Sequence, residues 1–414
     1  MSAEKTTQDS PTVDMMRSGA AVQGVSDWLI AQALGHIRLD SLFGELGERL
    51  VDAGVPVMRG LLAMSTLHPM FEATSFSWLR DGEAEITHFR RGASVEEVWQ
   101  RSPPAYMMKN DMAELRARLD DAKEHSRFPL WEELADQGAT DYLAFVTPFT
   151  DVLGAASRRD GMITSWATDR PGGFAEHHVQ ALKRLQLRLG VAVKIATREQ
   201  TAINVVSAYL GPHAGRRVLK GQIGLGDVET IPAVIWFSDL RDSTAISERL
   251  DADAFLDVLN DYFECAAGSV LDHGGEVLRF IGGAVLAIFS IEGPGGPERA
   301  ARMALAASRD ASARMAAVNA RRAADGADAI AFGVGLHFGE LLFGNIGVPE
   351  RIEFSVIGRA ANEASRLEGL TKSLERSLVV SAAFARLVPL EWENLGRHRL
   401  AGVSEESEVF APPP

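Results

Sequence analysis

The chain has 414 residues, a net charge of −14 and a pI near 5.3. Hydrophobic residues make up 46% of it and charged residues 24%, which is ordinary globular composition and excludes a disordered chain. The length predicts two or three domains, and the acidic balance argues against nucleic-acid binding, which needs clustered positive charge.

The start of the chain and its single cysteine indicate where the protein works. Residues 1–15 are polar and lack the basic-then-apolar order of a signal peptide, and no apolar run approaches the roughly 18–20 residues of a membrane span. Cys265, alone in an apolar helical pattern, excludes an internal disulfide and favours a buried small residue. We therefore expect a cytoplasmic protein without a membrane segment, with residues 1–20 disordered.

Residues 21–198 have the pattern of an α+β domain. From Val25 to Leu50 apolar residues recur at helical spacing, but three glycines leave one long helix or two short helices open. Around Pro103-Pro104 the pattern predicts a long loop, residues 93–109. The other predicted elements are strands at 57–64, 71–79, 142–148 and 161–167 and a helix at 130–137.

The end of this region carries a resemblance. After the strand that begins at Gly161 come a Pro-Gly-Gly turn and a long helix to Arg198. Apolar residues lie mostly on one face of that helix: Val179, Leu182, Leu185, Leu189, Val191 and Ile195. This order resembles the last strand and closing helix of GAF-type sensor domains, and implies a GAF-like sensor domain over residues 21–198. The alternative is any α+β domain followed by an amphipathic helix.

Residues 199–230 are expected to form a helical linker and a hinge. The helical pattern continues through Thr201–Leu210, where a dimer seam and a solvated linker helix are both open. Gly211–Gly226 is glycine-rich and basic but lacks the G-x-x-x-x-G-K-[ST] pattern of a phosphate-binding loop. Its basic residues are therefore interpreted as solvated hinge charges.

The last region, residues 231–412, begins with an apolar run, Ala233–Phe237, typical of a central strand buried on both faces. Asp239 stands at the end of this strand, and Ser243 or Thr244 is placed to cap the following helix. Mg²⁺ prefers oxygen ligands, and amides at a helix start can meet a phosphate, so this arrangement suits a metal that carries a polyphosphate. Aspartate also caps helices, so the signal alone is weak.

Four motifs follow one another in this region: FSDLRDST, HGGEVLRFIGGAVLAIF, GVGLHFGELLFGNIG and FSVIGRAANEASRLEGLTK. Together they resemble the catalytic domain of class III adenylyl/guanylyl cyclases, in the order that this family has. The elements predicted along them are a helix at 254–271, a hairpin at 275–290, a helix at 298–322, a strand pair at 330–347, a strand at 351–358 and a helix at 359–370.

The resemblance implies both a fold and a reaction. The fold is a ferredoxin-like α/β sandwich, so the whole chain is predicted to be α+β, with the cyclase domain preceded by the GAF-like sensor domain. Two such domains pair head to tail and form active sites at their interface. The ribose 3′-hydroxyl attacks the α-phosphate and pyrophosphate leaves, with two divalent cations, Mg²⁺ or Mn²⁺, at the attacking and leaving oxygens.

The resemblance also assigns residues to the chemistry. Asp239 matches the first metal-binding aspartate, beside the backbone carbonyl of Leu240 as a further ligand. Asn362 and Arg366 match the ribose-orienting asparagine and the transition-state arginine, and four residues apart they share a helix face. For these two the alternative is a solvated helix face.

The base-selecting pair of the family aligns with Arg279 and Ser355. A hydroxyl residue at the second position is frequent in bacterial adenylyl cyclases of this class, so ATP is the expected substrate. Arg279 as a plain strand residue is the alternative. His337, in a strand whose family counterpart often carries histidine, is interpreted as structural.

Other positions depart from the family pattern. Gly283 occupies the place of the second metal-binding aspartate and offers no side-chain ligand. Asp242 stands at a different point of its turn, so it is not expected to place its oxygens alike. Ala401 aligns with a lysine that holds the triphosphate, and Arg399 is close enough in sequence to substitute.

Two functions follow from these matches and departures. The first is a sensor-regulated cyclase that makes 3′,5′-cyclic AMP and pyrophosphate from ATP, as a homodimer or as a heterodimer with another cyclase. The alternative is a catalytically impaired regulatory or nucleotide-binding module that serves as the half-site partner of an intact cyclase, because Gly283 replaces the second carboxylate.

Overall fold

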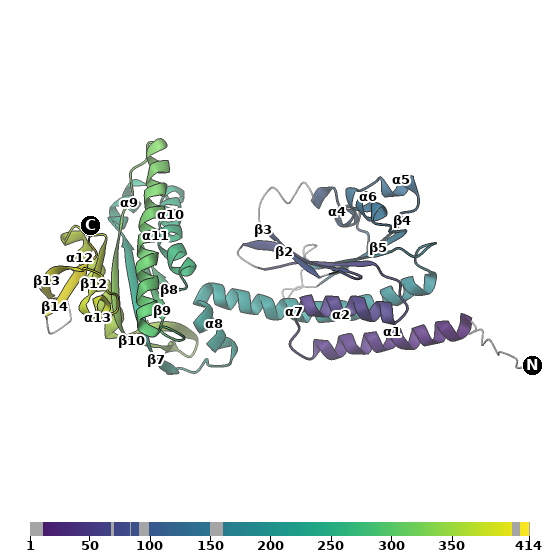
Figure 1. Ribbon diagram of the computed structural model, residues 1–414, viewed down its shortest axis with the longest axis horizontal. Coiled ribbons are helices and arrows are strands. Elements are labelled where there is room, and N and C mark those ends of the chain that lie inside the picture. Colours follow the sequence, from purple (N-terminus) through teal and green to yellow (C-terminus); the bar gives the residue numbers. More distant parts are fainter. Residues whose placement is uncertain are drawn as a thin grey trace, which may run out of the picture. The chain divides into compact units, whose positions relative to one another are not determined.

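The computed structural model describes residues 11–67, 70–82, 84–90, 99–149, 160–399 and 406–413. The chain divides into two compact units, Met1–Val205 and Val206–Pro414, and passes from one to the other within helix α7 (Glu176–Leu210) (Figure 1). Within the described ranges, none of the helices has the length and apolar character that crossing a bilayer requires.

The first unit contains an antiparallel six-stranded sheet with the strand order β3-β2-β1-β6-β5-β4. Its strands are β1 (Arg59–Ser65), β2 (Phe71–Leu79), β3 (Glu85–Arg90), β4 (Glu114–Arg118), β5 (Asp141–Pro148) and β6 (Gly161–Thr168). Both faces carry a core, because successive side chains of a strand point to opposite faces: Leu143 belongs to one buried cluster and Tyr142 to the other.

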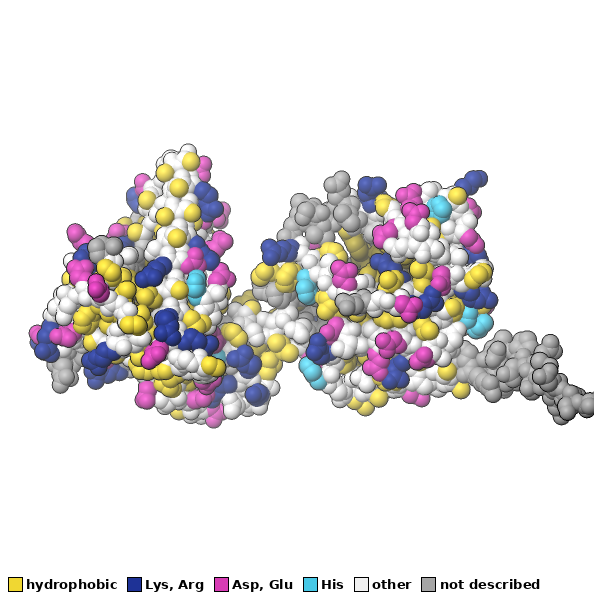
Figure 2. All heavy atoms as spheres, in the orientation of Figure 1, with side chains coloured by type: hydrophobic (Ala, Val, Ile, Leu, Met, Phe, Trp, Pro, Cys, Tyr) yellow, Lys and Arg dark blue, Asp and Glu magenta, His cyan; other side chains and the backbone are white. Residues whose placement is uncertain are grey.

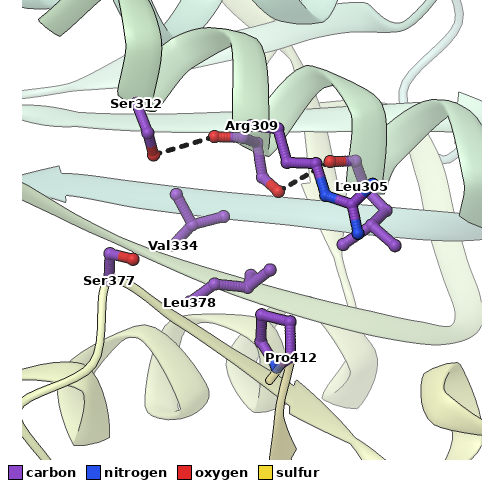
Figure 3. A pocket seen from close by; sticks show the side chains of 8 residues that line it. Leu305, Arg309, Ser312, Val334, Ser377, Leu378 and Pro412 are labelled. Atoms are coloured by element: carbon purple, nitrogen blue, oxygen red, sulfur yellow. Dashed lines mark hydrogen bonds between the residues drawn. The ribbon is translucent and has the colours of Figure 1, made fainter. Parts of the chain in front are cut away.

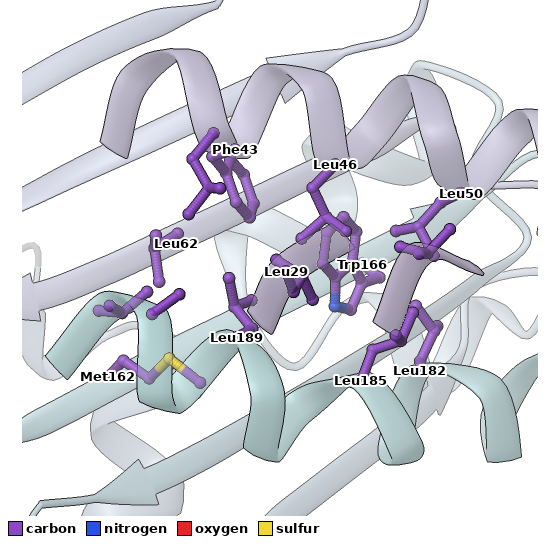
Figure 4. Close-up of a cluster of buried hydrophobic side chains, with 14 of the residues drawn as sticks. Leu29, Phe43, Leu46, Leu50, Leu62, Met162, Trp166, Leu182, Leu185 and Leu189 are labelled. Carbon is purple, nitrogen blue, oxygen red and sulfur yellow. The ribbon is translucent and has the colours of Figure 1, made fainter. Parts of the chain in front are cut away.

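One face of this sheet is covered by α2 and α7, whose leucines meet around Leu62 and Trp166 (Figure 4). The other face packs against residues of α4 and α6, among them Met107 and Trp131. The helices of this unit, besides α7, are α1 (Pro11–Ala33), α2 (Leu39–Asp52), α4 (Pro103–Lys109), α5 (Ala122–His125) and α6 (Pro129–Asp136).

Most elements expected for this unit are present, but the start of the chain differs from the expectation. The segment 25–50 forms two helices, which resolves that alternative, and the predicted strands and the helix near 130–137 are confirmed. Residues 11–20 are helical rather than disordered, since a helix anchored by buried Val22 and Leu29 extends back to Pro11. Residues 1–10 lie outside the described residues.

The expected loop at 93–109 is wrong from Pro103 onward. Pro103 and Pro104 occupy the first turn of α4, where a missing backbone N–H costs nothing, and Ser102 caps that helix. Residues 91–98 lie outside the described residues. The helix α7 is longer than its apolar stripe, and Val191, expected on the buried face, is 48% exposed.

The second unit contains an eight-stranded sheet with the order β13-β14-β12-β10-β7-β9-β8, and β11 pairs with the far part of β10. Its strands are β7 (Val228–Leu240), β8 (Glu276–Ile281), β9 (Ala284–Ser290), β10 (Phe332–Val348), β11 (Arg351–Ile357), β12 (Leu378–Ser381), β13 (Glu393–Arg399) and β14 (Glu406–Ala411).

Helices cover both faces of this second sheet. Val234 and Trp236 point into the core under α10 and α11, whereas Ala233 and Ile235 point into the core under α12. This sandwich confirms the predicted α+β fold. The helices are α8 (Pro212–Leu219), α9 (Ser243–Arg249), α10 (Ala252–Asp272), α11 (Gly296–Ala324), α12 (Arg359–Ser373) and α13 (Ala382–Ala385).

The strand pair expected over 330–347 is a single 17-residue strand, β10. Three of its glycines, Gly333, Gly335 and Gly339, lie against residues of α12. A Cβ atom on Gly335 would stand 2.2 Å from the backbone oxygen of Ala364. Glycine is therefore required here for the close approach of a helix to the sheet.

Charges of both signs mix on the molecular surface. In the face that Figure 2 shows, acidic side chains lie among the basic ones on each unit instead of leaving a separate basic area. This distribution agrees with the net charge of −14.

Candidate active site

Asp239 lies near the end of β7, opposite Ala284 of β9 and Gly333 of β10. Its side chain points to the α12 face of the sheet, because residues 233 and 235 of the same strand point there. The carboxyl group is half-buried, and this burial raises the pKa of Asp239. In the described part of the chain no cationic side chain pairs with it.

The turn after Asp239 differs from the expected cap. Asp242 adopts the left-handed conformation with φ 56°, and Ser243 is the first residue of α9, without a side-chain cap at this end. The carboxylate of Asp242 is exposed and accepts from Lys372 Nζ at 2.6 Å. That Asp242 does not replace the missing ligand stays a prediction.

Gly283, in the turn between β8 and β9, lies directly beside Asp239. A Cβ atom at Gly283 would stand 3.3 Å from Asp239 Oδ1 and 3.3 Å from Ser243 Cβ. The amide of Leu240 donates to the carbonyl oxygen of Gly283 at 3.1 Å, which ties this turn to the end of β7. A side chain at position 283 would therefore enter the space in front of Asp239.

These contacts show which metal complement fits. The Asp239 carboxylate, with the Leu240 carbonyl, suits one oxygen-preferring cation. The described residues contain no group of three or more His, Cys, Asp and Glu side chains that could hold a metal ion. The expected pair of cations is thus short of one protein carboxylate, at Gly283.

Arg279 and Ser355 come together although β8 and β11 are not paired strands. Arg279 NH1 donates to Ser355 Oγ at 3.4 Å. The same guanidinium forms an ion pair with Glu353, a residue that the sequence analysis did not single out. Its position two residues before Ser355, on the same side of a strand, is the signal that would have found it.

Asn362 and Arg366 lie on the exposed side of α12, while Ala364 and Leu367 of the same helix are buried. Among the described residues, neither makes a side-chain hydrogen bond or an ion pair. Their neighbours are engaged, since Arg359 donates to Glu363 at 2.7 Å. The structure thus leaves the amide of Asn362 and the guanidinium of Arg366 open to an external group.

Comparison with known proteins identifies this unit. Residues 228–409 match the family described as adenylate and guanylate cyclase catalytic domain. An adenylate cyclase of Anabaena cylindrica is 30% identical over 164 residues, which are 40% of this chain and 32% of that protein. Residues 228–409 form a class III nucleotide cyclase catalytic domain.

Two further similarities are to an uncharacterized protein and to a solved structure. An uncharacterized protein of Mycobacterium bovis is 30% identical over 272 residues, 60% of this chain and 48% of that protein. The solved adenylyl cyclase CyaB from P. aeruginosa covers 44% of this chain and 94% of its own, at 25% identity and a TM-score of 0.41. The chain spans less than half the length of both curated relatives.

A second carboxylate of the cyclase domain lies near Asp239 and was missed. Glu368 of α12 faces the sheet, and a Cβ atom on Gly333, the strand partner of Asp239, would stand 2.5 Å from Glu368 Oε1. Burial, and then the charge of Asp239, raise the pKa of Glu368 to about 7. The sequence signal was its place four residues after Ala364 and three before Thr371, on the inward side of the helix.

His337 of the cyclase domain is buried between two elements. Its Nδ1 lies 3.0 Å from Ser381 Oγ and its Nε2 lies 3.4 Å from Glu363 Oε2. Burial lowers the pKa of His337. Because Ser381 Oγ also accepts from the amide of Phe384, these contacts cap α13 and agree with the structural role expected for His337.

The expected triphosphate contact involves Ala401 and its proposed substitute Arg399, near the gap in the described residues after 399. Arg399 ends β13, opposite Glu406 of β14. Ala401 lies outside the described residues. The assignment of a triphosphate contact to this segment therefore stays a prediction.

A hollow in the cyclase domain lies away from these residues. It is bordered by Leu305, Ser308, Arg309 and Ser312 of α11, by Val334 and by residues near β12 and β14 (Figure 3). Val334 and Leu305 belong to the core on the α11 side of the sheet. The hollow is thus on the face opposite Asp239 and is not part of the candidate active site.

Proposed function

We propose that the chain is a cyclase that converts ATP to 3′,5′-cyclic AMP and pyrophosphate. The supporting observation is that Asp239 and the Arg279–Ser355 pair share one face of the sheet. Arg279 stands opposite Leu286 and Asp239 opposite Ala284, and these two β9 residues are two apart, so their side chains point the same way.

Each of the site residues has a separate role toward one bound nucleotide. Asp239 would hold a divalent cation, which when bound would supply positive charge to the triphosphate. Ser355 accepts from the amino group of adenine, and Arg279 donates to the neighbouring ring nitrogen. Asn362 orients the ribose, and Arg366 stabilises charge on the phosphorus oxygens. The 3′-hydroxyl loses its proton to solvent, its oxygen bonds to the α-phosphorus, and the bond from the α-phosphorus to the leaving pyrophosphate oxygen breaks.

The exposed pair on α12 supports a homodimer as the working form. Asn362 and Arg366 have no polar partner in the described structure, so they are available to a nucleotide held by the Asp239 face of a second copy. Symmetric dimers reuse one patch on both subunits, so such a pairing completes two sites at once.

The first unit is proposed to regulate this activity in the cytoplasm as a GAF-like sensor domain over residues 21–198. Support comes from α7, a continuous helix of 35 residues in which the chain leaves that unit. Residues 199–230, with α8 inside them, are proposed to act as the linker and hinge.

Gly283 favours a second candidate function. Without a carboxylate beside Asp239, the domain could bind nucleotide without turning it over and lend Asn362 and Arg366 to an intact cyclase. This module would be silent alone and active in a mixed dimer.

The deciding experiment measures cyclic-nucleotide production by the purified chain with ATP and with GTP, in Mg²⁺ and in Mn²⁺. The matched variants are Gly283→Asp and Asp239→Ala. We expect cyclic AMP from the unaltered chain, strongest in Mn²⁺, and a loss of about 100-fold or more in Asp239→Ala. Activity in Gly283→Asp alone would support the half-site module, and activity retained in Asp239→Ala would contradict the role of Asp239.

A further inference from the structure

The hollow between α11 and the strands β10 and β12 has a volume of about 240 Å³ and lies on the face of the sheet opposite Asp239 (Figure 3). Pockets that hold drug-sized ligands span roughly 300–1,000 Å³, so this hollow suits a smaller molecule. Part of its lining is apolar and comes from Leu305, Val334, Leu378 and Pro412. Val334 and Leu378 are partners in the parallel pairing of β10 and β12, so this wall belongs to the rigid sheet.

Arg309 of α11 brings a positive charge to this hollow. Figure 3 shows its side chain reaching from the helix toward the strands that close the hollow. In the described part of the chain its guanidinium makes neither a hydrogen bond nor an ion pair. The carboxylate next to it in sequence, Asp310, is engaged by Arg314 at 2.8 Å. A guanidinium beside an apolar wall loses part of its hydration, which strengthens its attraction for an anion.

Three serines also line the hollow, and two of them offer only acceptor oxygens. Ser308 Oγ donates to the carbonyl oxygen of Leu305 at 2.9 Å, and Ser312 Oγ donates to that of Ser308 at 3.0 Å. A hydroxyl group has a single proton, so both oxygens keep only their acceptor capacity for a ligand. The third serine, Ser377, is exposed at the rim. Two acceptor oxygens in the lining disfavour a ligand with many acceptor oxygens of its own.

These groups favour a monocarboxylate over a phosphate as the ligand. One guanidinium matches the two oxygens of one carboxylate in a bidentate pair. A phosphate carries more acceptor oxygens and more charge than Arg309 alone satisfies, and the oxygens of Ser308 and Ser312 oppose it. The apolar wall adds the second requirement, because burying a hydrocarbon chain against it stabilises the complex.

We propose that this hollow is a binding site for a small aliphatic monocarboxylate, which pairs with Arg309 and packs its hydrocarbon chain against Val334 and Leu378. A bound acid contacts both α11 and β12, the strand that follows α12 in the chain. The cyclase domain thus carries a ligand site of its own, apart from the first unit. The inference is independent of the proposed function, because binding at this face needs neither nucleotide nor turnover.

The test measures the Kd of 4-methylpentanoate for the full chain by ligand-observed NMR, in buffer without nucleotide or metal. Two comparison ligands are 4-methylpentanamide, which has nearly the same shape without the charge, and inorganic phosphate. The variants are Arg309→Gln and Ser312→Leu, both at exposed positions of α11, and the second fills the hollow with an apolar side chain. The control Arg302→Gln removes an equal charge about two turns earlier on α11, at a residue outside the lining. Thermal melts verify that each variant is folded.

We expect a Kd of about 1 mM for 4-methylpentanoate, the affinity of a ligand with about eight non-hydrogen atoms. Arg309→Gln should weaken binding about fivefold to tenfold, because an exposed guanidinium loses part of its effect to solvent. Ser312→Leu should weaken binding by a similar factor, because its side chain takes the space of the ligand. The amide and phosphate should bind at least about fivefold more weakly than the acid, and Arg302→Gln should leave the Kd unchanged.

An equal Kd for 4-methylpentanoate in the unaltered chain and in Arg309→Gln would overturn the inference, as would an equal loss in Arg302→Gln. Tighter binding of inorganic phosphate than of the acid would show a general anion site and overturn the carboxylate assignment. No binding up to about 20 mM acid would overturn the site altogether. None of these results bears on the proposed function, which cyclic-nucleotide production tests separately.

Discussion

A Cβ atom at Gly283 would lie 3.3 Å from Oδ1 of Asp239. A carboxylate there would lie beside that of Asp239, as a metal pair requires. The backbone of Gly283 lies outside the left-handed region that its neighbour Gly282 occupies at φ 59°, so other residues fit its conformation.

Gly283→Asp is therefore expected to create a metal-dependent stability. Without metal, two carboxylates repel in a half-buried site, and the Tm should fall by about 2–4 °C, the effect of roughly 1 kcal/mol in a domain of this size. Mn²⁺ should reverse the loss. Thermal melts in EDTA and in Mn²⁺ measure this, with Gly283→Asn as the control of equal shape without the charge. Equal responses of the two variants to Mn²⁺ would contradict a metal at this position.

The raised pKa of Glu368 predicts how stability depends on pH. Its pKa rises from the ordinary 4.5 in the unfolded chain to about 7 in the folded one, so the folded state binds the proton more tightly. The contribution of Glu368 is then complete below about pH 4.5 and is lost as the pH rises through 7.

Glu368→Gln should remove that loss, so its Tm should fall less between pH 5.5 and pH 8.5 than the Tm of the unaltered chain. Melting curves across this range test the prediction in metal-free buffer. Glu350→Gln, in the exposed turn between β10 and β11, is the matched control. Parallel pH profiles for the Glu368→Gln and unaltered chains would show that Glu368 is not protonated near neutrality.

Gly335→Ala should destabilise the cyclase domain by about 1–3 kcal/mol, because its Cβ atom would stand 2.2 Å from the backbone oxygen of Ala364. Urea unfolding measures the change. Gly369→Ala is the control on α12 itself, since a Cβ atom there meets nothing within 4 Å and alanine favours a helix. The prediction fails if Gly335→Ala is as stable as Gly369→Ala.

Mixing two inactive variants tests whether sites form between chains. Asp239→Ala and Arg366→Ala each lack one half of the proposed site, so a mixed dimer contains one intact site and one doubly damaged site. An equal mixture should recover about a quarter of the unaltered activity, because half of the dimers are mixed and each has one working site. A mixture of Asp239→Ala with the double variant is the control, and recovery there would exclude complementation.

Strand and helix patterns predicted most of the strands and helices of both units. The spacing of apolar residues and the turn residues depend on local structure. The patterns failed where a residue served a distant element. The expected strand pair over 330–347 is one strand, and the need for a small residue at Gly335 comes from α12, about 30 positions later in the sequence. Pro103 resembled a break because the pattern did not show the helix that it begins.

Of the candidate site, too, the sequence predicted some residues and missed others. Asp239, Gly283, Arg279 and Ser355 were found by motif, and the structure brings them into two neighbouring groups on one face. Glu353 and Glu368 were missed, because each becomes notable only through contacts across the fold, with Arg279 and with the strand partner of Asp239. Their local signals, a place two residues before Ser355 and a place on the inward side of α12, gain meaning only together with these contacts.

The half-site module, the second candidate function, has a consequence for gene dosage. Each copy would bring one half of two different sites, so the number of working sites would depend on the ratio of this chain to any intact cyclase that pairs with it. An excess of this chain would convert self-paired intact enzymes into dimers with a single working site. A higher abundance of this chain would then lower cyclic-nucleotide output, independently of any signal that the first unit receives.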